Sequence, residues 1–299
     1  MRNKKYILTM DIGGTTFTSG IFDNNLNLIY ISPESYIQDY KSKSELILGF
    51  ESQIVSLCNK YNVLLENVIG LSIAAPGPLN SKNGMILNTP NLIILKNTNI
   101  VSIMENKLGL SVKLENDANL FALGEWYLYF QKYNFVTALT LGSGLGVGLI
   151  VNRQLFKGAH GMGAEYGISP YESGLWEDEI SIEGVEKQSL KYFDNTLSPK
   201  ELYDLATQGD LKALKIWNDF GKKFGLFISH IVNLLDPNIV TIGGGLSGSF
   251  IYFNQSMKSS IKKYAPSYEY NSIKICVSEN QLNSTHYGAA LILKTYKLS

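Results

Sequence analysis

Cysteine is scarce in this sequence, and its two copies stand far apart. Cys58 and Cys276 have no C-x-x-C spacing, and the three histidines, His160, His230 and His286, show no metal-ligand spacing. A four-ligand zinc site built on cysteine is therefore excluded. We expect the two thiols to be buried or idle side chains in a reducing compartment.

The sequence also lacks an excess of either charge and any long hydrophobic run. Its 26 Lys and Arg balance its 26 Asp and Glu, so no broad field draws it to nucleic acid or acidic membranes. No segment has 18 consecutive apolar residues, and the N-terminus lacks the apolar core and cleavage site of a signal peptide. We expect a cytoplasmic protein that spans no membrane. An anionic ligand must then be held locally.

What the 299 residues do contain is a repeated plan of apolar strands that end in glycine-rich turns. A strand–turn–strand pattern occurs near residue 6 and again near residue 135. The expected strands are 6–10, 17–22, 26–36, 68–74, 112–115, 135–141, 147–151, 238–242 and 273–277. The expected helices are 44–61, 101–108, 117–129, 211–235, 256–264 and 287–296. Two similar halves predict two α/β domains with a ligand cleft between them.

The glycine-rich turns suit one task, which is the binding of phosphate. Without a β-carbon the backbone can approach a phosphate and point its amides at it. The turn at 11–16 adds a carboxylate, Asp11, that can order a hydrated magnesium ion. Taken singly, each turn is equally compatible with an ordinary tight hairpin. Three of them, at 11–16, 142–146 and 243–245, favour a nucleoside triphosphate.

Asp117 stands at the junction of an expected strand and an expected helix, between Asn116 and Asn119. One interpretation is a helix cap, which stabilises by about 1 kcal/mol. The other is a general base that accepts a proton from a sugar hydroxyl while the neighbouring amides hold the sugar. The two are compatible, and spacing alone does not separate them.

Six motifs in order make the chain resemble the ROK family of sugar kinases and related repressors, within the actin-like ATPase superfamily. They are DIGGT at 11–15, APGP at 75–78, ENDAN at 115–119 with ALGE at 122–125, TLGSGLG at 140–146, GAHGMGAEYG at 158–167 and DPNIVTIGGG at 236–245. Each motif alone is modestly specific, and six in order are highly specific. The resemblance covers nearly the whole chain.

The resemblance implies a fold and a set of residue roles. The fold is a two-domain, ribonuclease H-like α/β fold with an interdomain cleft, in which a small domain spans 1–116 plus the C-terminal helix at about 284–299, and a large domain spans 117–283. ATP with Mg²⁺ would be the cofactor and a homodimer the assembly. Asp11 would face the magnesium ion, and the nucleotide would be bound by Gly13, Gly14, Thr15, Gly142, Ser143, Gly144, Gly243, Gly244 and Gly245.

The same resemblance makes Asp117 the base and assigns the sugar contacts. These would be Asn91, Asn116, Asp117, Glu165 and Glu177, with Glu183 as the second choice for the last. The sugar itself stays open among glucose, mannose, fructose, allose, N-acetylglucosamine and N-acetylmannosamine, with glucose as the first guess.

The chain departs from the family at one loop. Many members have a histidine three residues after the glutamate matched by Glu165, followed by a cysteine-rich zinc loop; this chain has Ile168 there and no cysteine up to Glu177. We expect the short loop to be closed by apolar packing, with the candidates Tyr166, Ile168, Tyr171, Leu175 and Trp176. The departure leaves the base and the phosphate turns in place but removes one sugar contact.

Two other functions stay in view. The family's repressors carry a helix-turn-helix domain before the kinase-like part, and here the first strand is expected within ten residues, which leaves no room for one. A sugar-binding regulator without catalysis is the remaining alternative, and the presence of Asp11 and Asp117 argues against it. An ATP-coupled assay with a panel of sugars separates an enzyme from a sensor.

We predict that the purified protein contains no structural zinc, because the thiolates that would hold it are missing. Elemental analysis after dialysis against metal-free buffer measures this directly. Stoichiometric zinc would contradict our interpretation of the loop at 168–177.

Overall fold

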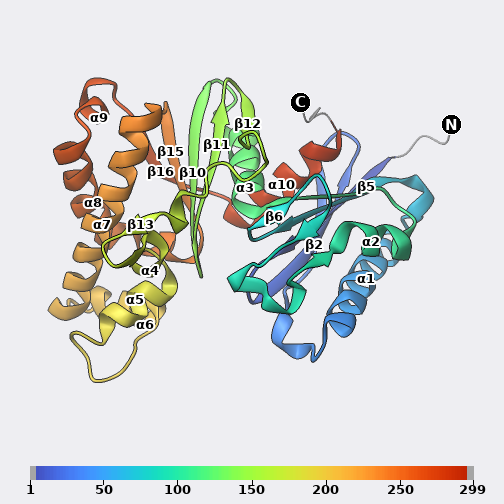
Figure 1. Ribbon diagram of the computed structural model, residues 1–299, viewed down its shortest axis with the longest axis horizontal. Helices are drawn as coiled ribbons and strands as arrows, with labels where there is room; N and C mark the ends of the chain where they lie inside the picture. The colour runs from blue at the N-terminus through green and yellow to red at the C-terminus, as the bar shows by residue number, and fades with distance from the viewer. Residues whose placement is uncertain (1–4, 295–299) are drawn as a thin grey trace. The chain divides into compact units, whose positions relative to one another are not determined.

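The computed structural model describes residues 5–294, apart from the side chains of residues 91, 281 and 282, and it divides into two compact units. The first unit is Met1–Tyr129 with Leu155–Gly163 and Leu282–Ser299, and the second is Phe130–Gln154 with Ala164–Gln281. In Figure 1 the first runs from blue to green and takes in the red helix α10. Residues 117–129 group with the first unit. The domain boundary after residue 116, which the motif pattern implies, stays a prediction.

The first unit is built on a mixed sheet with the order β3-β2-β1-β5-β9, and the short strand β4 pairs with β2. Its strands are β1 (Tyr6–Ile12), β2 (Thr16–Asp23), β3 (Leu28–Ile31), β4 (Ser35–Tyr36), β5 (Val68–Ala75) and β9 (Val112–Asn116). β1 and β2 form an antiparallel hairpin, and β1, β5 and β9 run parallel. The expected strand at 26–36 is thus two short strands, β3 and β4.

Side chains that alternate along β1 bind the sheet to helices on its two faces, because successive strand residues point in opposite directions. Leu8, Met10 and Ile12 join a buried cluster with the apolar residues of α1 (Lys43–Lys60) and α2 (Ile100–Leu108). Thr9, on the other face, is hydrogen-bonded to buried His286 of α10 (Gln281–Lys294). Helix α3 (Asp117–Glu125) follows β9 directly and continues into a turn of π-helix, η4 (Trp126–Phe130).

Short elements complete the first unit. They are the helical turns η1 (Ile37–Asp39), η2 (Leu65–Asn67) and η3 (Pro90–Leu95) and the small sheet of β6 (Leu79–Asn80), β7 (Met85–Ile86) and β8 (Thr98–Asn99).

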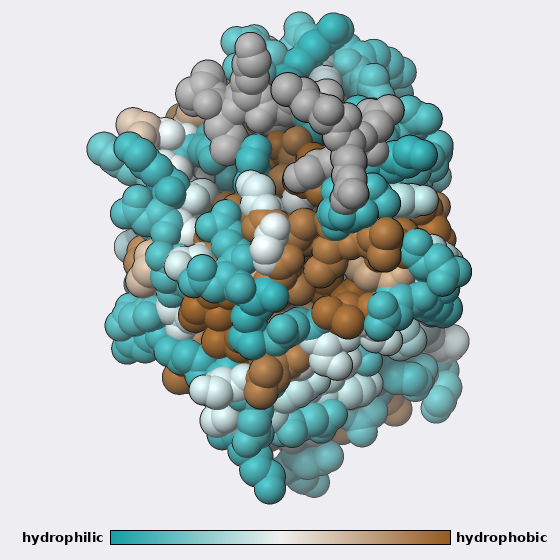
Figure 2. All heavy atoms as spheres, turned by 90° about the vertical axis from the view of Figure 1, so that its right-hand side faces the viewer, coloured by the Kyte–Doolittle hydropathy of each residue, from teal (hydrophilic) through white to brown (hydrophobic). Residues whose placement is uncertain are grey.

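Figure 2 shows the face on the right-hand side of Figure 1. Hydrophobic residues gather toward the centre of this face, and hydrophilic residues surround them.

The second unit has a sheet with the order β12-β11-β10-β15-β16. Its strands are β10 (Phe135–Leu141), β11 (Leu145–Val151), β12 (Gln154–Phe156), β15 (Ile239–Gly243) and β16 (Lys274–Val277). β10 and β11 form an antiparallel hairpin, and β10, β15 and β16 run parallel. The central part of the first sheet is therefore repeated, as the sequence predicts.

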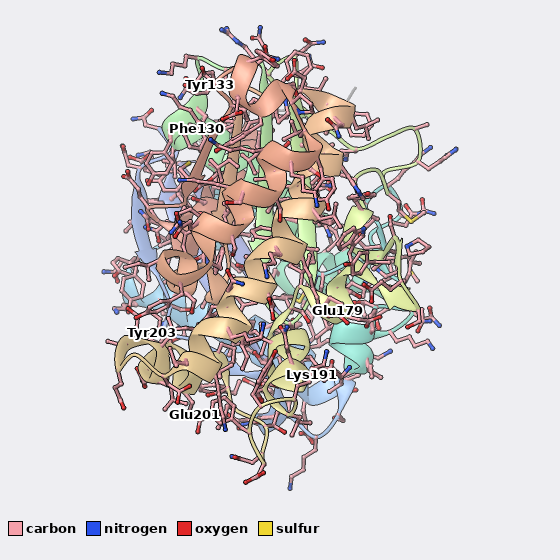
Figure 3. The ribbon with its side chains drawn as sticks, turned by 90° about the vertical axis from the view of Figure 1, so that its left-hand side faces the viewer. Phe130, Tyr133, Glu179, Lys191, Glu201 and Tyr203 are labelled. Atoms are coloured by element: carbon pink, nitrogen blue, oxygen red, sulfur yellow. The ribbon has the colours of Figure 1, made fainter. Side chains whose placement is uncertain are left out.

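Two long helices, α7 (Leu211–Leu235) and α8 (Phe250–Tyr264), pack against each other in the second unit. Figure 3, which faces the left-hand side of Figure 1, shows them side by side toward the viewer. Helix α7 has the bounds expected from its apolar periodicity, whereas α8 starts six residues before the expected 256. The shorter elements are η5 (Tyr166–Ile168), β13 (Pro170–Tyr171), β14 (Gly174–Leu175), α4 (Trp176–Glu179), α5 (Ile182–Ser189), α6 (Pro199–Thr207), η6 (Gly245–Ser249) and α9 (Ser267–Tyr270).

The last helix of the chain is longer at its start than the sequence predicts. Helix α10 begins at Gln281, six residues before the expected start, and the last two residues of the expected 287–296 lie outside the described part of the chain. Within residues 5–294, none of the helices combines the length and apolar character needed to cross a bilayer.

Gly225 sets how closely α7 and α8 approach, and we predict that Gly225→Ala destabilises the protein by about 1–3 kcal/mol. A β-carbon there would lie 2.2 Å from the carbonyl oxygen of Met257, and this clash outweighs the roughly 1 kcal/mol of helix propensity that alanine adds. Urea unfolding measures the difference. Gly248→Ala, which meets no atom within 4 Å, is the matched control; equal stability of both variants would contradict the packing argument.

Candidate active site

The carboxyl ends of the parallel strands β1, β5 and β9 bring two distant motifs together in the first unit. Asp11 lies opposite Ala74 in the β1–β5 pair, and Ala75 lies opposite Asn116 in the β5–β9 pair. Asp117 follows at the next position, as the first residue of α3. Ligands of open α/β sheets bind at the carboxyl ends of the strands. The edge that carries Asp11 and Asp117 is therefore the candidate site.

The turn after β1 is closed by its own backbone. The amide of Gly13 donates to the carbonyl oxygen of Thr16 at 2.8 Å, and the carbonyl oxygen of Thr15 accepts from the amide of Ile37 at 2.8 Å. Gly13 and Gly14 are partly exposed and Thr15 is exposed. The turn that the sequence predicts as a phosphate contact is thus ordered and open to a ligand.

Asn116, not Asp117, caps helix α3. The side-chain oxygen of Asn116 accepts from the amide of Asn119 at 3.0 Å. Asp117 Oδ1 accepts from the amide of Ala118 at 2.8 Å, which leaves the capping position to its neighbour. The two interpretations of Asp117 are therefore separable, because the cap does not depend on its carboxylate.

The two aspartates of this edge both have pKa values above the ordinary value for aspartate. Burial, and then the negative charge of Asp117, raise the pKa of Asp11 to about 7. Burial also raises the pKa of Asp117, although hydrogen bonds from the backbone amides of Ala118 and Asp117 oppose that shift. Carboxylates held in this way favour either a proton or a nearby cation, and such groups concentrate at functional sites.

In the second unit the other two glycine turns lie side by side. β10 and β15 are parallel neighbours, with Thr140 opposite Gly243, so the turn at 142–144 and the turn at 243–245 follow adjacent strand ends. Gly244 has φ of +85°, and a β-carbon there would lie 2.3 Å from the carbonyl oxygen of Leu141. Only glycine fits this close approach of the turn at 243–245 to the end of β10.

The residues expected to contact sugar differ in what surrounds them. Glu177 of α4 is half-buried and accepts from the backbone amide of Leu145, and burial, with the neighbouring Asp178 charge, raises its pKa. Glu183, the second choice, is exposed and pairs with Lys187 at 2.8 Å on its own helix. Glu165 directly precedes η5. Asn91 falls in η3, and its side chain lies outside what the structure describes.

Comparison with known proteins identifies the family. The model of the ROK family matches residues 7–296. This chain belongs to the ROK family. Its relatives include a glucokinase of Thermotoga maritima, 26% identical over 97% of this chain and 98% of that protein, and an N-acetyl-D-glucosamine kinase of Haemophilus influenzae, 29% identical over 84% and 88%.

A solved structure shows the fold that this ROK chain adopts. The ROK family glucokinase of Streptomyces griseus, crystallised with glucose and AMPPNP, superposes with a TM-score of 0.79 at 21% identity, covering 95% of this chain and 98% of that one. The fold is thus the two-domain α/β fold of the actin-like ATPases, as the motifs predict.

Aromatic side chains fill the loop where many ROK proteins bind zinc. Trp176 is 2% exposed, stacks on Tyr171 with 3.8 Å between ring centroids and meets Phe227 edge-on. Tyr166 also packs on Phe227, and its hydroxyl is hydrogen-bonded to His230 Nδ1 at 2.7 Å. Apolar packing is therefore present around three of the five candidates, Tyr166, Tyr171 and Trp176.

Ile168, His160 and His230 near this loop differ in exposure and in partners. Ile168 is 48% exposed, so it does not help to close the loop. His230, from α7, is a partner that the sequence pattern did not reveal, because nothing local links it to a tyrosine 64 residues earlier. His160, two residues after Gly158, is exposed.

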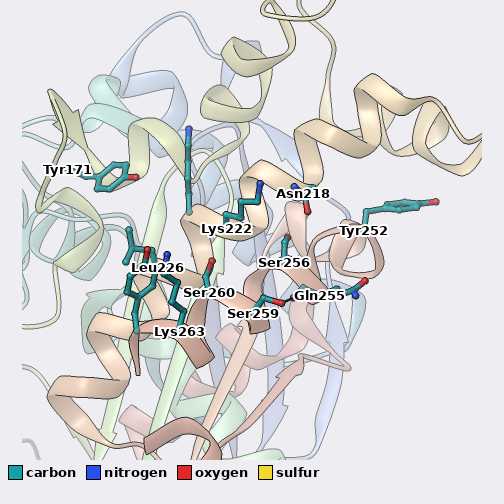
Figure 4. Close-up of a pocket in the computed structure, with 12 residues that line it drawn as sticks. Tyr171, Asn218, Lys222, Leu226, Tyr252, Gln255, Ser256, Ser259, Ser260 and Lys263 are labelled. Atoms are coloured by element: carbon teal, nitrogen blue, oxygen red, sulfur yellow. Dashed lines mark hydrogen bonds between the residues drawn. The ribbon is translucent and has the colours of Figure 1, made fainter. Parts of the chain in front are cut away.

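A pocket of about 650 Å³ lies on the second unit between α7, α8 and Tyr171, as Figure 4 shows. Three lysines are among its lining residues, but two already have acidic partners, since Lys222 pairs with Asp219 and Lys223 with Glu179. The glycine turns at 142–144 and 243–245 are not among its lining residues. Its charge is thus largely neutralised, and we assign it no ligand.

We predict that Asp11→Asn stabilises the ligand-free protein more at pH 8 than at pH 5. An aspartate whose pKa is raised in the folded state binds more protons there than in the unfolded chain, so its stability contribution falls as pH rises from about 4 to about 7. Each pKa unit is worth about 1.4 kcal/mol, enough to shift Tm by a few degrees. Thermal unfolding without nucleotide or magnesium checks this, with the exposed Asp39→Asn as control. A pH-independent difference in Tm would contradict it.

Proposed function

We propose that this ROK family protein is an ATP-dependent sugar kinase that transfers the γ-phosphoryl group of ATP to a hydroxyl of a hexose or an N-acetylhexosamine. The observation that carries the proposal is the edge formed by β1, β5 and β9, where Asp11 and Asp117 are both present with raised pKa values. The relatives described as glucokinase and N-acetyl-D-glucosamine kinase support it.

Asp117 is the general base in this proposal. A sugar hydroxyl is a poor nucleophile, and phosphoryl transfer depends mainly on in-line positioning and on neutralising charge. A base works best when its pKa lies near the operating pH, and burial moves the pKa of Asp117 in that direction. The carboxylate accepts the hydroxyl proton as the phosphoryl group is transferred.

The remaining predicted residues hold the reactants. Asn116, Asn91, Glu165 and Glu177 bind the sugar hydroxyls and fix the ring. The glycine turns present backbone amides to the phosphates, in the way that such turns bind anions generally. The adjacency of the turns at 142–144 and 243–245 supports one shared nucleotide contact.

Magnesium fits the residues at the end of β1. Asp11 offers an oxygen ligand of the kind that Mg²⁺ prefers, and its raised pKa reflects a negative charge that a cation would stabilise. When bound with ATP, the ion would neutralise phosphate charge. We also propose, from the family resemblance, that the protein works in the cytoplasm and forms a homodimer. Sedimentation analysis can check the dimer.

We predict that Asp117→Asn keeps the affinity for ATP and sugar but lowers kcat by about 10²–10⁴-fold, the usual range for general-base catalysis. The substitution removes the proton acceptor and leaves the Asn116 cap intact, so the fold is retained. A coupled ATP assay over a sugar panel, with isothermal titration of sugar and nucleotide, measures both quantities.

Two outcomes would change the assignment. Turnover of Asp117→Asn near the parental rate would show that the base lies elsewhere. A parent protein that binds sugar but turns over no member of the panel would favour the alternative, a non-catalytic sugar-binding regulator.

A further inference from the structure

Glu115, the residue immediately before Asn116 and Asp117, is a buried carboxylate. Its side chain is 2% exposed, at the end of β9 where the chain turns into α3. A buried carboxylate is costly unless it is paired with a cation and its oxygens accept hydrogen bonds. The partners of Glu115 therefore decide whether the start of α3 is well ordered.

Both oxygens of Glu115 are engaged. Oε1 accepts from the amide of Asn116 at 3.0 Å, from Asn119 Nδ2 at 3.1 Å and from Ser81 Oγ at 3.4 Å. Oε2 accepts from Lys157 Nζ at 2.7 Å. The first set ties the carboxylate to the residues on either side of Asp117, and the second supplies the compensating charge.

Lys157 reaches Glu115 from a distant part of the chain. It follows β12 and belongs to the segment Leu155–Gly163 of the first unit. Its carbonyl oxygen accepts from the amide of Gly163 at 2.8 Å, so the loop that begins at Lys157 closes back on it. The Lys157 side chain is 20% exposed, and its ammonium is therefore held mainly by this ion pair.

We propose that Lys157 is a positioning residue for phosphoryl transfer, acting through Glu115 to hold Asn116 and Asn119, and hence Asp117 between them, in the geometry the reaction needs. This inference rests on the proposed kinase function. It assigns Lys157 no contact with sugar or phosphate, because its ammonium is already paired with Glu115. Displacing a base by about 1 Å can cost on the order of 10²-fold in rate.

Lys157→Met is the test variant, because methionine keeps much of the length of the side chain and removes its charge. We expect kcat to fall by about 10–100-fold, with KM for ATP changed less than about twofold, since the nucleotide turns are untouched. Lys157→Arg keeps the cation and should restore most of kcat. A merely structural role would lower the amount of folded protein but leave the kcat of the folded fraction unchanged.

The chain offers a matched control in the same unit. Lys107 pairs with Glu51 at 2.6 Å, with both side chains 29% exposed, and we expect Lys107→Met to keep parental kcat. Equal kcat for Lys157→Met and the parent, or equal losses in Lys157→Met and Lys107→Met, would overturn the inference.

A double-substitution cycle covers the case in which Lys157→Met does not fold. Lys157→Met with Glu115→Gln removes both charges, so no unpaired charge stays buried. Because the two residues act as one unit, the combined loss in kcat should equal that of Glu115→Gln alone. An additional tenfold loss in the double variant would show that Lys157 acts independently of Glu115, and would overturn the inference.

Hydrogen exchange separates this inference from the proposed function. If the parent phosphorylates no sugar, the kinase proposal fails, but the amides of Asn116 and Asn119 still report on the link from Lys157 to α3. We expect these two amides to exchange at least tenfold faster in folded Lys157→Met than in the parent, and at the parental rate in Lys107→Met. Unchanged exchange in Lys157→Met would overturn the inference whatever the activity.

Discussion

Parallel pairing of β1, β5 and β9 is the constraint on which the rest of the candidate site depends. The pairing carries Asp11 and Asp117, more than a hundred residues apart in the chain, to one edge of one sheet. It also imposes a cost, because two carboxylates share a region from which much of the water is withdrawn. Proteins commonly accept such destabilisation where a charge is needed for function.

The second unit repeats this strand arrangement with different residues at the strand ends. β10, β11 and β15 are related in the same way as β1, β2 and β5, an antiparallel hairpin whose first strand pairs in parallel with a later one. Here the strand ends carry glycine instead of acid, and the backbone itself supplies the polar groups. The strand ends of the two units therefore differ in chemistry, with carboxylates at those of the first unit and backbone amides at those of the second.

The loop after Glu165 is held by aromatic packing. Trp176, Tyr171 and Tyr166 meet Phe227 and His230 of α7 through ring contacts and one hydrogen bond. Aromatic pairs each add about 0.5–1.5 kcal/mol beyond the burial of their area. Such packing holds Trp176 in place directly before Glu177, the residue expected to bind sugar.

Much of this protein was determined by the local sequence. The apolar periodicity of α7, the glycine turns at the strand ends and the order of the motifs predicted the elements, the repeat and the fold, because each depends on residues that are neighbours in the chain. The helices α4, α5 and α6 escaped prediction, and the four residues of α4 make only about one turn, too few for an apolar period.

The tertiary structure alone decided which side chains meet. Only the folded chain shows that Tyr166 bonds to His230 and that Lys157 compensates Glu115. Lys157 and Glu115 are 42 residues apart in the chain, and Tyr166 and His230 are 64 residues apart. No local sequence pattern therefore encodes either contact. Burial is also a property of the packed molecule, and it is burial that raises the pKa values of Asp11 and Asp117.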